Sequence, residues 1–527
     1  MPGADLLIGV DAGTSVIKAV AFDLGGRQLG AASVPNQYAS GADGSATQSL
    51  AKTWADCAAA LRGLQAKAPN LAARTAAVAV TAQGDGTWLV GKDSAPVADA
   101  WLWLDARAAP TVERLEASPL SRARFEATGT GLNTCQQGSQ LAHLDRHAPD
   151  LLDRAEVALH CKDWLYLKLT GRRATDPSEA SFTFGNFRNR RYDDAVIEAL
   201  GLTRRRNLLP QIIDGTMVTD PLTPEAAAET GLRAGTPVSL GYVDMVMTAL
   251  GAGVCGGGAG VTCSIVGSTG VHMRAVPVSG VRLNDEGSGY VIALPSPGFV
   301  VQMQSNMATS LNIDWVLGLA ADVLKETGRE ISHRDLVNRI EDWLTEGRPG
   351  QIVYLPYISE AGERGPFGNA NARAGFVGLS VNHRYADLVR AVAEGLGLAM
   401  RDCYLAMGDL PSELRLSGGA ARSKALRGIL SASVNAPVRV SAREEAGAAG
   451  AAMMAAVAIG AYPDMDSCVA EWVTPLLSPP ESPDPALVSL YDQLFEAYAA
   501  ARRGLVPAWD LLASARRRTT ARERAMA

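Results

Sequence analysis

The chain has 527 residues, of which 47% are hydrophobic and 20% are charged, and its net charge is −6. This length exceeds what one hydrophobic core usually serves, so two or more domains are expected. These proportions of hydrophobic and charged residues are typical of a globular protein. Because no basic patch stands out, the composition argues against a partner that is nucleic acid or an anionic membrane surface.

The seven cysteines are scattered along the chain, with no CxxC pair and no His/Cys spacing typical of a metal site. An odd, dispersed set is typical of reduced thiols and predicts a cytoplasmic protein. The N-terminus has neither a basic region nor a long apolar run, so we expect no signal peptide. No apolar window is long enough to span a bilayer.

The chain opens with a predicted β-meander. Its strands cover residues 6–11, 16–23 and 28–34, and its first turn consists of Gly13, Thr14 and Ser15. Backbone N–H groups and hydroxyls at such a turn can hold phosphate oxygens. Asp11, at the strand end, suits a hydrated Mg²⁺, and Lys18 adds positive charge nearby. This is not a Walker loop, because no helix follows. A structural turn without a ligand explains the pattern equally well.

A second polar group follows an amphipathic helix predicted over residues 49–67 and a strand at 78–82. It consists of Gln83, Gly84 and Asp85, with Asp105 further along the chain. Open α/β sheets place ligand contacts at the carboxyl ends of strands. Side chains that accept or bridge hydroxyl hydrogen bonds suit a neutral polyhydroxyl ligand. Considered alone, the two acids are more typical of turn stabilisation.

Residues 108–235 are predicted to be largely helical, with Pro and Gly breaks. Within them, residues 162–171 form a helix that ends at a glycine, and Thr175 and Asp176 form the following turn. We interpret this segment as structural.

Residues 237–253 begin as a buried strand and end as small and apolar residues at helical spacing. Asp244 lies where the strand becomes a helix. Its carboxylate should meet free backbone N–H groups and the positive end of the helix dipole, and so stay ionised. A plain helix cap explains Asp244 when it is considered alone. The other motifs favour a base that deprotonates a hydroxyl for phosphoryl transfer.

The second half of the chain repeats the hairpin pattern at residues 260–272. Its turn consists of Gly267, Ser268 and Thr269. Two phosphate-type hairpins in successive halves suggest a duplicated fold that clamps a nucleotide between the halves.

Glycines and small residues follow in two further segments. A strand at 414–416 leads to Gly418, Gly419, Ala420 and Ser423 ahead of a helix, where the backbone can approach a ligand closely. The small residues 446–452, after Glu445, can be approached by a flat base or by another helix. We expect the arginine-rich tail from residue 511 to be solvated and frayed.

Together these motifs resemble the FGGY carbohydrate kinases, within the actin–hexokinase ATPase fold. Residues 11–15 and 267–270 resemble the two phosphate motifs of that family, and residues 417–420 with 445–452 resemble its adenosine motif. Residues 374–379 and 387–394 resemble the C-terminal signature, and Asp244 matches the catalytic Asp. The resemblance covers nearly the whole chain in order.

The resemblance implies an α/β protein with two actin-like ATPase (ribonuclease H-like) domains and an interdomain cleft. Residues 1–252 would carry the polyol site and the first phosphate hairpin, residues 253–510 the second hairpin and the adenosine site, and residues 511–527 a basic tail. ATP and Mg²⁺ are implied as cofactors, the latter near Asp11 and Asp244. The resemblance also leaves room for a homodimer.

The substrate is predicted from the positions at which this chain differs from other members of the family. Where this chain has Gly84 and Asp85, glycerol kinases carry Arg-Glu and xylulokinases carry Met-His. At the position of Met245, glycerol kinases carry Gln and xylulokinases carry Asn. Residues 81–88 and 101–108 look most like erythritol kinases. Losing an Arg or a His suits a ligand that has only hydroxyls, so a terminal hydroxyl of erythritol is the expected acceptor. Pentulose and glycerol kinases are the alternatives.

A rival from another class is a non-enzymatic ATP switch of the actin or chaperone kind. It would keep both phosphate turns but would need neither a base at Asp244 nor the polar residues 83–85. A transcription regulator would need a basic helix-turn-helix segment, and the sequence has none.

Overall fold

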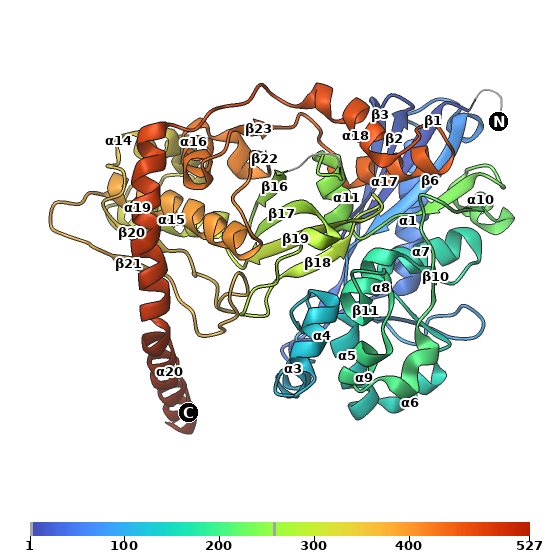
Figure 1. Ribbon diagram of the computed structural model, residues 1–527, viewed down its shortest axis with the longest axis horizontal. Helices are drawn as coiled ribbons and strands as arrows, with labels where there is room; N and C mark the ends of the chain where they lie inside the picture. The colour runs from blue at the N-terminus through green and yellow to red at the C-terminus, as the bar shows by residue number, and fades with distance from the viewer. Residues whose placement is uncertain (1–3, 257–259, 527) are drawn as a thin grey trace.

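The computed structural model describes residues 4–256 and 260–526, which form two lobes around two six-stranded sheets (Figure 1). The first sheet has the strand order β14-β15-β6-β1-β2-β3, and the second has β18-β19-β17-β16-β22-β23. The first comprises β1 Leu6–Ala12, β2 Val16–Asp23, β3 Gln28–Pro35, β6 Thr75–Ala82, β14 Thr219–Pro221 and β15 Pro237–Leu240. The second comprises β16 Val261–Val266, β17 Gly270–Pro277, β18 Tyr290–Ala293, β19 Phe299–Asn306, β22 Glu413–Ser417 and β23 Val438–Val440.

The two sheets share one topology. In the first, β1, β2 and β3 are antiparallel neighbours, while β6 and β15 continue the sheet in parallel to β1. In the second, β16, β17 and β19 are antiparallel neighbours, and β22 and β23 continue it in parallel. The β-meander and the duplication expected from the two hairpins are therefore confirmed.

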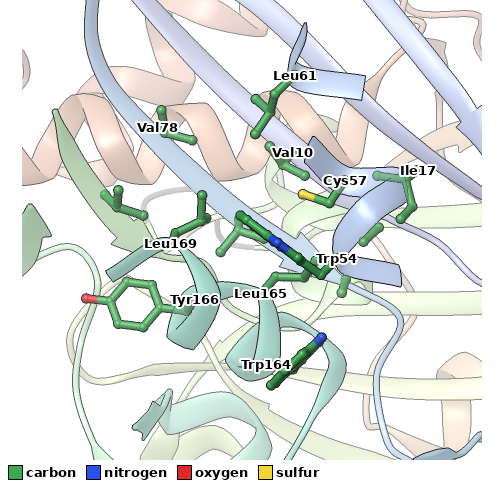
Figure 2. Packing of buried hydrophobic residues seen from close by; sticks show 14 of the residues in the cluster. Val10, Ile17, Trp54, Cys57, Leu61, Val78, Trp164, Leu165, Tyr166 and Leu169 are labelled. Carbon is green, nitrogen blue, oxygen red and sulfur yellow. The ribbon is translucent and has the colours of Figure 1, made fainter. Parts of the chain in front are cut away.

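Two helices cover one face of the first sheet: α1 Leu50–Leu64 and α7 Cys161–Thr170. The hydroxyl of Ser49 caps α1 by accepting the N–H of Lys52. Alternate residues of β1 and β6, such as Val10 and Val78, point into the same core as Leu61 of α1 (Figure 2). The strand period of two thus places every second apolar side chain beneath these helices.

The other face of the first sheet is covered by α11 Asp244–Gly251 and by α17 Ala446–Ala458, which comes from the far end of the chain (Figure 1). A Cβ on Gly9 of β1 would lie 1.9 Å from the carbonyl oxygen of Ala448, so only glycine allows this approach. A Cβ on Gly251 would lie 2.1 Å from the carbonyl oxygen of Ala446. Residues 447–456 are buried in this packing. Of the two uses expected for residues 446–452, the structure shows packing against another helix, and their part in an adenosine site stays a prediction.

One hydrophobic core joins the two lobes. It contains Leu7 and Phe22 of the first sheet together with Cys263 and Met273 of the second. α18 Met465–Trp472 also packs on the first sheet, where the rings of Trp472 and Phe22 lie 5.4 Å apart. Because late segments pack on the early lobe, the expected boundary at residue 252 stays a prediction.

Helices dominate the rest of the chain, including residues 108–235, as predicted. The first lobe carries α2 Leu71–Arg74, α3 Ala109–Glu116, α4 Ser121–Thr128, α5 Gln137–His147, α6 Pro149–Arg154, α8 Pro177–Phe184, α9 Asp194–Ala199 and α10 Pro224–Thr230. The second carries α12 Ser310–Glu326, α13 His333–Asn338, α14 Ile340–Glu346, α15 Tyr385–Ala406, α16 Lys424–Val434 and α19 Pro485–Gly504. Short strands include β7 Trp88–Val90, paired with β9 Val157–Leu159, and β20 Val353–Leu355, paired with β21 Gly375–Val377.

The C-terminal tail is helical. α20 Val506–Met526 continues beyond α19 and extends away from the second lobe (Figure 1). The expectation of a frayed end is therefore wrong, and the physical reason is that Ala, Leu and Arg are strong helix formers. Among the described residues, we find no helix with the length and apolarity that a membrane crossing requires.

Candidate active site

A cavity of about 200 Å³ lies between the two lobes. Its N-terminal wall consists of Thr14, Gly84, Asp85, Trp103, Cys135, Asp244 and Met245. Its C-terminal wall consists of Thr269, Val271, Tyr290, Met303, Ser305 and Arg364. The interdomain cleft is thus present, and its volume, below that of sites for drug-sized ligands, suits a small molecule.

The first hairpin turn is held by side chains of its own lobe. The Thr14 hydroxyl donates to Gln83 Oε1 (2.9 Å) and accepts from Trp103 Nε1 (2.8 Å). Asn36 Nδ2 donates to the carbonyl of Gly13 (2.9 Å), and the neighbouring Ser15 is exposed. The turn therefore presents a fixed Thr14 to the cavity. Gly13 has no positive φ, so its turn does not require glycine.

The second hairpin turn is held by the start of α12. The N–H groups of Thr309 and Ser310 donate to the carbonyls of Ser268 (2.8 Å) and Gly267 (2.9 Å). Ser268 is exposed, and Thr269 lines the cavity opposite Thr14. Equivalent turns of the two sheets thus face one cleft.

The glycine segment after β22 lies against this second turn. Gly418 has φ +90°, and a Cβ there would lie 2.6 Å from the carbonyl oxygen of Val266, the residue before Gly267. A Cβ on Gly419 would meet no atom within 4 Å. Ser423 caps α16 by accepting the N–H of Leu426. The side chain of Ala420 lies outside the described part of the chain.

Asp244 is the first residue of α11 and lines the N-terminal wall. Its Oδ1 accepts the N–H of Met245 (2.7 Å), while its other oxygen has no hydrogen-bond partner among the described residues. Burial raises the pKa of Asp244 well above its usual value, and the charge of Asp11 raises it further. The N–H of Met245 at the helix start lowers the pKa of Asp244, as the sequence predicts, but burial and the neighbouring acids outweigh this effect.

Asp11 lies at the end of β1, directly opposite Lys18 of β2. Lys18 forms an ion pair with Glu445, just before α17 (2.7 Å). Burial raises the pKa of Asp11 to about 6, although Lys18 favours the charged form. A Cβ on Gly447 would lie 2.3 Å from Asp11 Oδ2, so the glycine of α17 leaves space for this carboxylate.

Gly84 and Asp85 bring the backbone close to Asp244. A Cβ on Gly84 would lie 2.4 Å from Val243 Cγ2 and 3.8 Å from Asp244 Oδ1. Asp85 has φ +57°, and its N–H donates to Glu179 Oε1 (3.3 Å). Its Oδ1 is buried without a hydrogen-bond partner. Burial raises the pKa of Asp85, although the Cys135 thiol and nearby cations favour its charged form.

A buried charge network lies behind Asp85. It consists of His160, Lys162, Asp163, Asp176 and Glu179. His160 lies 3.5 Å from Glu179 and 3.1 Å from Asp163, and Lys162 lies 2.6 Å from Asp163 and 2.5 Å from Asp176. These residues belong to the segment that we interpreted as merely structural. The structure places that segment directly behind the cavity.

Gln83 and Asp105, expected to contact the ligand, do not line the cavity. Gln83 is occupied by the Thr14 hydroxyl and by Gln48, to which its Nε2 donates (2.8 Å). Asp105 is fully buried, pairs with Arg107 (2.6 Å) and accepts the N–H of Ala46 (2.9 Å). Both predictions are corrected: these side chains stabilise loops that surround the cavity.

Apart from Thr269, the C-terminal wall was not found from the sequence, although it supplies a cation. Arg364 lies in the loop 362–366, whose single arginine among glycines and a proline was the available signal. Tyr290 Oη accepts from Asn133 Nδ2 across the cleft (3.2 Å). The second lobe thus adds a positive side chain, Arg364, to the acceptors that the first lobe places in the cavity.

Comparison with known proteins agrees with this geometry. The family description "FGGY family of carbohydrate kinases, N-terminal domain" matches residues 6–251, and its C-terminal counterpart matches residues 262–459. The chain belongs to the FGGY family of carbohydrate kinases. As an FGGY protein, it is an ATP-dependent carbohydrate kinase with the two-domain actin-like ATPase fold. The non-enzymatic ATP switch is thereby ruled out.

Individual FGGY relatives are similar over nearly their full lengths. Erythritol kinase of Brucella abortus (strain 2308) is 70% identical over 510 residues, which cover 97% of this chain and 98% of the relative. L-xylulose/3-keto-L-gulonate kinase of Escherichia coli (strain K12) is 26% identical over 498 residues, covering 93% and 95%. The crystal structure of xylulose kinase from Rhodospirillum rubrum has a TM-score of 0.86 at 26% identity and covers 96% of this chain and 100% of that one.

Proposed function

We propose that this kinase transfers the γ-phosphoryl group of ATP to a terminal hydroxyl of a tetritol, with erythritol as the preferred substrate. The observation that carries the proposal is the 70% identity to an erythritol kinase over 97% of the chain. The small cavity, with the carboxyl groups of Asp85 and Asp244 on one wall, supports it.

In this proposal Asp244 orients the attacking hydroxyl and takes its proton. Asp244 lines the cavity and has one carboxyl oxygen without a hydrogen-bond partner among the described residues, and its raised pKa brings a carboxylate closer to the range in which a base works near neutral pH. Positioning supplies much of the rate in phosphoryl transfer, because little other covalent chemistry is required of the protein.

The two hairpin turns would hold the phosphate groups of ATP from opposite sides. Hydroxyls and backbone N–H groups of Thr14, Ser15 and Ser268 are the proposed contacts, with Lys18 adding charge nearby. Gly418 and Gly419 would let the adenosine end approach the backbone beside the second turn. Closure of the lobes would exclude the water that competes with the substrate.

The carboxyl groups of Asp11 and Asp244 fit a hydrated Mg²⁺. Both have raised pKa values, and the charge of Asp11 disfavours ionisation of Asp244, so a cation between them would favour both charged forms. No cluster of three or more acidic, His or Cys ligands occurs in the described residues, which agrees with an ion held mainly by water and phosphate oxygens. When bound, Mg²⁺ would neutralise charge on the phosphates.

The test is a coupled assay of ADP release with the purified protein at saturating MgATP. Erythritol, threitol, glycerol, xylitol, xylulose and ribulose are compared at equal enzyme concentration. We expect the highest kcat/KM for erythritol or threitol. A faster ketopentose or glycerol would refute the tetritol assignment and favour the pentulose or glycerol alternative.

We also propose a cytoplasmic location. All seven cysteines are buried, and none forms a disulfide within the described part of the chain, as is common where thiols stay reduced. A homodimer stays a prediction, which light scattering of the purified protein would test.

A further inference from the structure

Two side chains from different lobes, Asp85 and Arg364, line the same cavity. Each carries one buried atom, Asp85 Oδ1 and Arg364 Nε, that has no hydrogen-bond partner among the described residues. Asp85 follows β6 in the first lobe, whereas Arg364 follows β20 in the second. Buried polar atoms in native proteins nearly always have partners, so two orphans in one cavity indicate a ligand group that satisfies both.

The backbone that carries Arg364 is fixed on β19. Glu363 Oε1 accepts the N–H groups of Met307 (2.9 Å) and Arg364 (2.9 Å), and Asn306 Nδ2 donates to the carbonyl of Gly365 (2.9 Å). The guanidinium itself makes no hydrogen bond or ion pair with the described residues. The loop therefore presents a free donor from a rigid support, as a binding site requires.

The backbone of Asp85 is fixed in the same way from the opposite side. Its N–H is bound by Glu179, which the charge network holds through His160. Among the described residues, no hydrogen bond reaches Asp85 Oδ1, and no direct ion pair joins Asp85 to Arg364. The backbones that carry the acceptor and the donor are thus both fixed, and the two side chains do not satisfy each other.

We propose that Asp85 and Arg364 together form a hydroxyl clamp that recognises a hydroxyl of the polyol other than the one that Asp244 deprotonates. The clamped hydroxyl donates a hydrogen bond to the carboxylate of Asp85 and accepts one from the guanidinium of Arg364, because one hydroxyl is both donor and acceptor. This inference rests on the proposed polyol kinase function. It adds a specificity residue from the second lobe and makes the substrate bridge the cleft.

The clamp explains why the length of the polyol should affect binding. A polyol must be long enough to place one hydroxyl at Asp244 and another between the two clamp residues. A shorter polyol leaves the clamp unsatisfied, and an unpaired buried donor or acceptor weakens binding. Clamp variants should therefore affect a tetritol more than glycerol.

The first experiment compares wild type with Arg364→Met, which keeps the length of the side chain but removes its donors. We expect kcat/KM for erythritol to fall roughly tenfold or more, mainly through KM. The value for glycerol should change less than about threefold, and the KM for ATP should not change. Arg282→Met is the matched control, because Arg282 is an exposed arginine of the same lobe, paired only with exposed Asp409.

A double-mutant cycle tests whether both residues recognise the same hydroxyl. Asp85→Gly removes the carboxylate without strain, because glycine tolerates the positive φ of this position. If one hydroxyl joins the pair, the double variant should lose little more than the weaker-binding single variant. Additive losses, equal losses on glycerol and erythritol, or an unchanged Arg364→Met enzyme would each overturn the clamp.

The cycle also separates this inference from the proposed function. If the wild-type enzyme phosphorylates no tetritol, the proposed function fails, and the clamp fails with it. If the wild-type enzyme prefers a tetritol but Arg364→Met behaves as wild type, only the clamp fails. Thermal melting of each variant establishes that the variants are folded.

Discussion

The two walls of the cavity are built by different means. Behind the N-terminal wall, the charge network of five buried ionisable side chains holds the segment around Asp85. Among the described residues, the C-terminal wall has no such network; backbone hydrogen bonds to Glu363 and Asn306 hold its cation, Arg364. The comparison teaches that the first lobe lines the cavity with two carboxyl groups of raised pKa, Asp85 and Asp244, whereas the second lobe lines it with a donor, Arg364.

The network also reaches Asp244. Asp176 caps α8 and bonds the hydroxyl of Ser178, which in turn accepts the N–H of Val243 (3.0 Å), the residue before Asp244. Although burial alone would lower the pKa of Lys162, the charges of Asp163 and Asp176 raise it. The network is thus a fixed ionic support beneath both cavity carboxylates of the N-terminal wall.

The largest expected effect concerns the chemistry of the N-terminal wall. Asp244→Asn removes the base while keeping the shape of the side chain, so kcat should fall by about 10²–10⁴. The affinity for ATP should change little, because the phosphate turns are untouched. Steady-state kinetics with isothermal titration of nucleotide measure both. A folded Asp244→Asn enzyme with normal turnover would reduce Asp244 to a helix-start residue.

The second prediction tests the ionic support. Lys162→Met leaves Asp163 and Asp176 buried without their cation, so the free energy of unfolding should fall by about 3–5 kcal/mol. Arg122→Met is the control: Arg122 pairs with Glu126 on the surface of α4, and its loss should cost at most about 1 kcal/mol. Urea denaturation measures both variants. Equal losses of unfolding free energy in the two variants would mean that the network stabilises the fold no more than a surface ion pair does.

A third prediction compares two glycines of the N-terminal wall region. Gly84→Ala forces a Cβ against Val243 and should shift Asp244, lowering kcat roughly tenfold. Gly13→Ala meets only its own hairpin carbonyl, that of Val16, at 3.1 Å, and should fold normally. Melting temperatures and kcat of the two variants check this. A larger effect on kcat in Gly13→Ala would contradict the assignment of Gly84 as the closer support of Asp244.

The sequence predicted the repeated hairpins, the helix that begins at Asp244 and the family, because these depend on local pattern and on ordered motifs. It did not predict which carboxylates face the cavity. Asp85 and Asp105 both follow aromatic or apolar strands in the sequence, but Asp105 forms an ion pair with Arg107, whereas Asp85 forms none within the described residues. Pairing of this kind depends on tertiary neighbours, which a single sequence does not reveal.

The dependence on tertiary neighbours also explains the other differences between the sequence-based predictions and the structure. The small residues of α17 are compatible with a base or with a helix, and only the structure shows the close approach of α11 and β1 to them. Arg364 is separated from Asp85 by most of the chain, so no spacing rule joins them. The charge network likewise combines residues of α7 and α8 that were interpretable only as caps and turns.

The smallest expected effect concerns the side chains that hold the first phosphate turn. Gln83→Met removes the amide that accepts from the Thr14 hydroxyl, which frees Thr14 without touching the cavity. Loss of one such bond, worth about 1 kcal/mol, should raise the KM for ATP roughly threefold to fivefold and leave the KM for the polyol unchanged. These hydrogen bonds of the second turn do not depend on a side chain, because backbone N–H groups at the start of α12 donate them. Gln28→Met, on the exposed edge strand β3, is the control. If Gln83→Met instead raised the KM for the polyol more than that for ATP, Gln83 would contact the substrate in the closed enzyme, and the two turns would not differ in the way that the structure indicates.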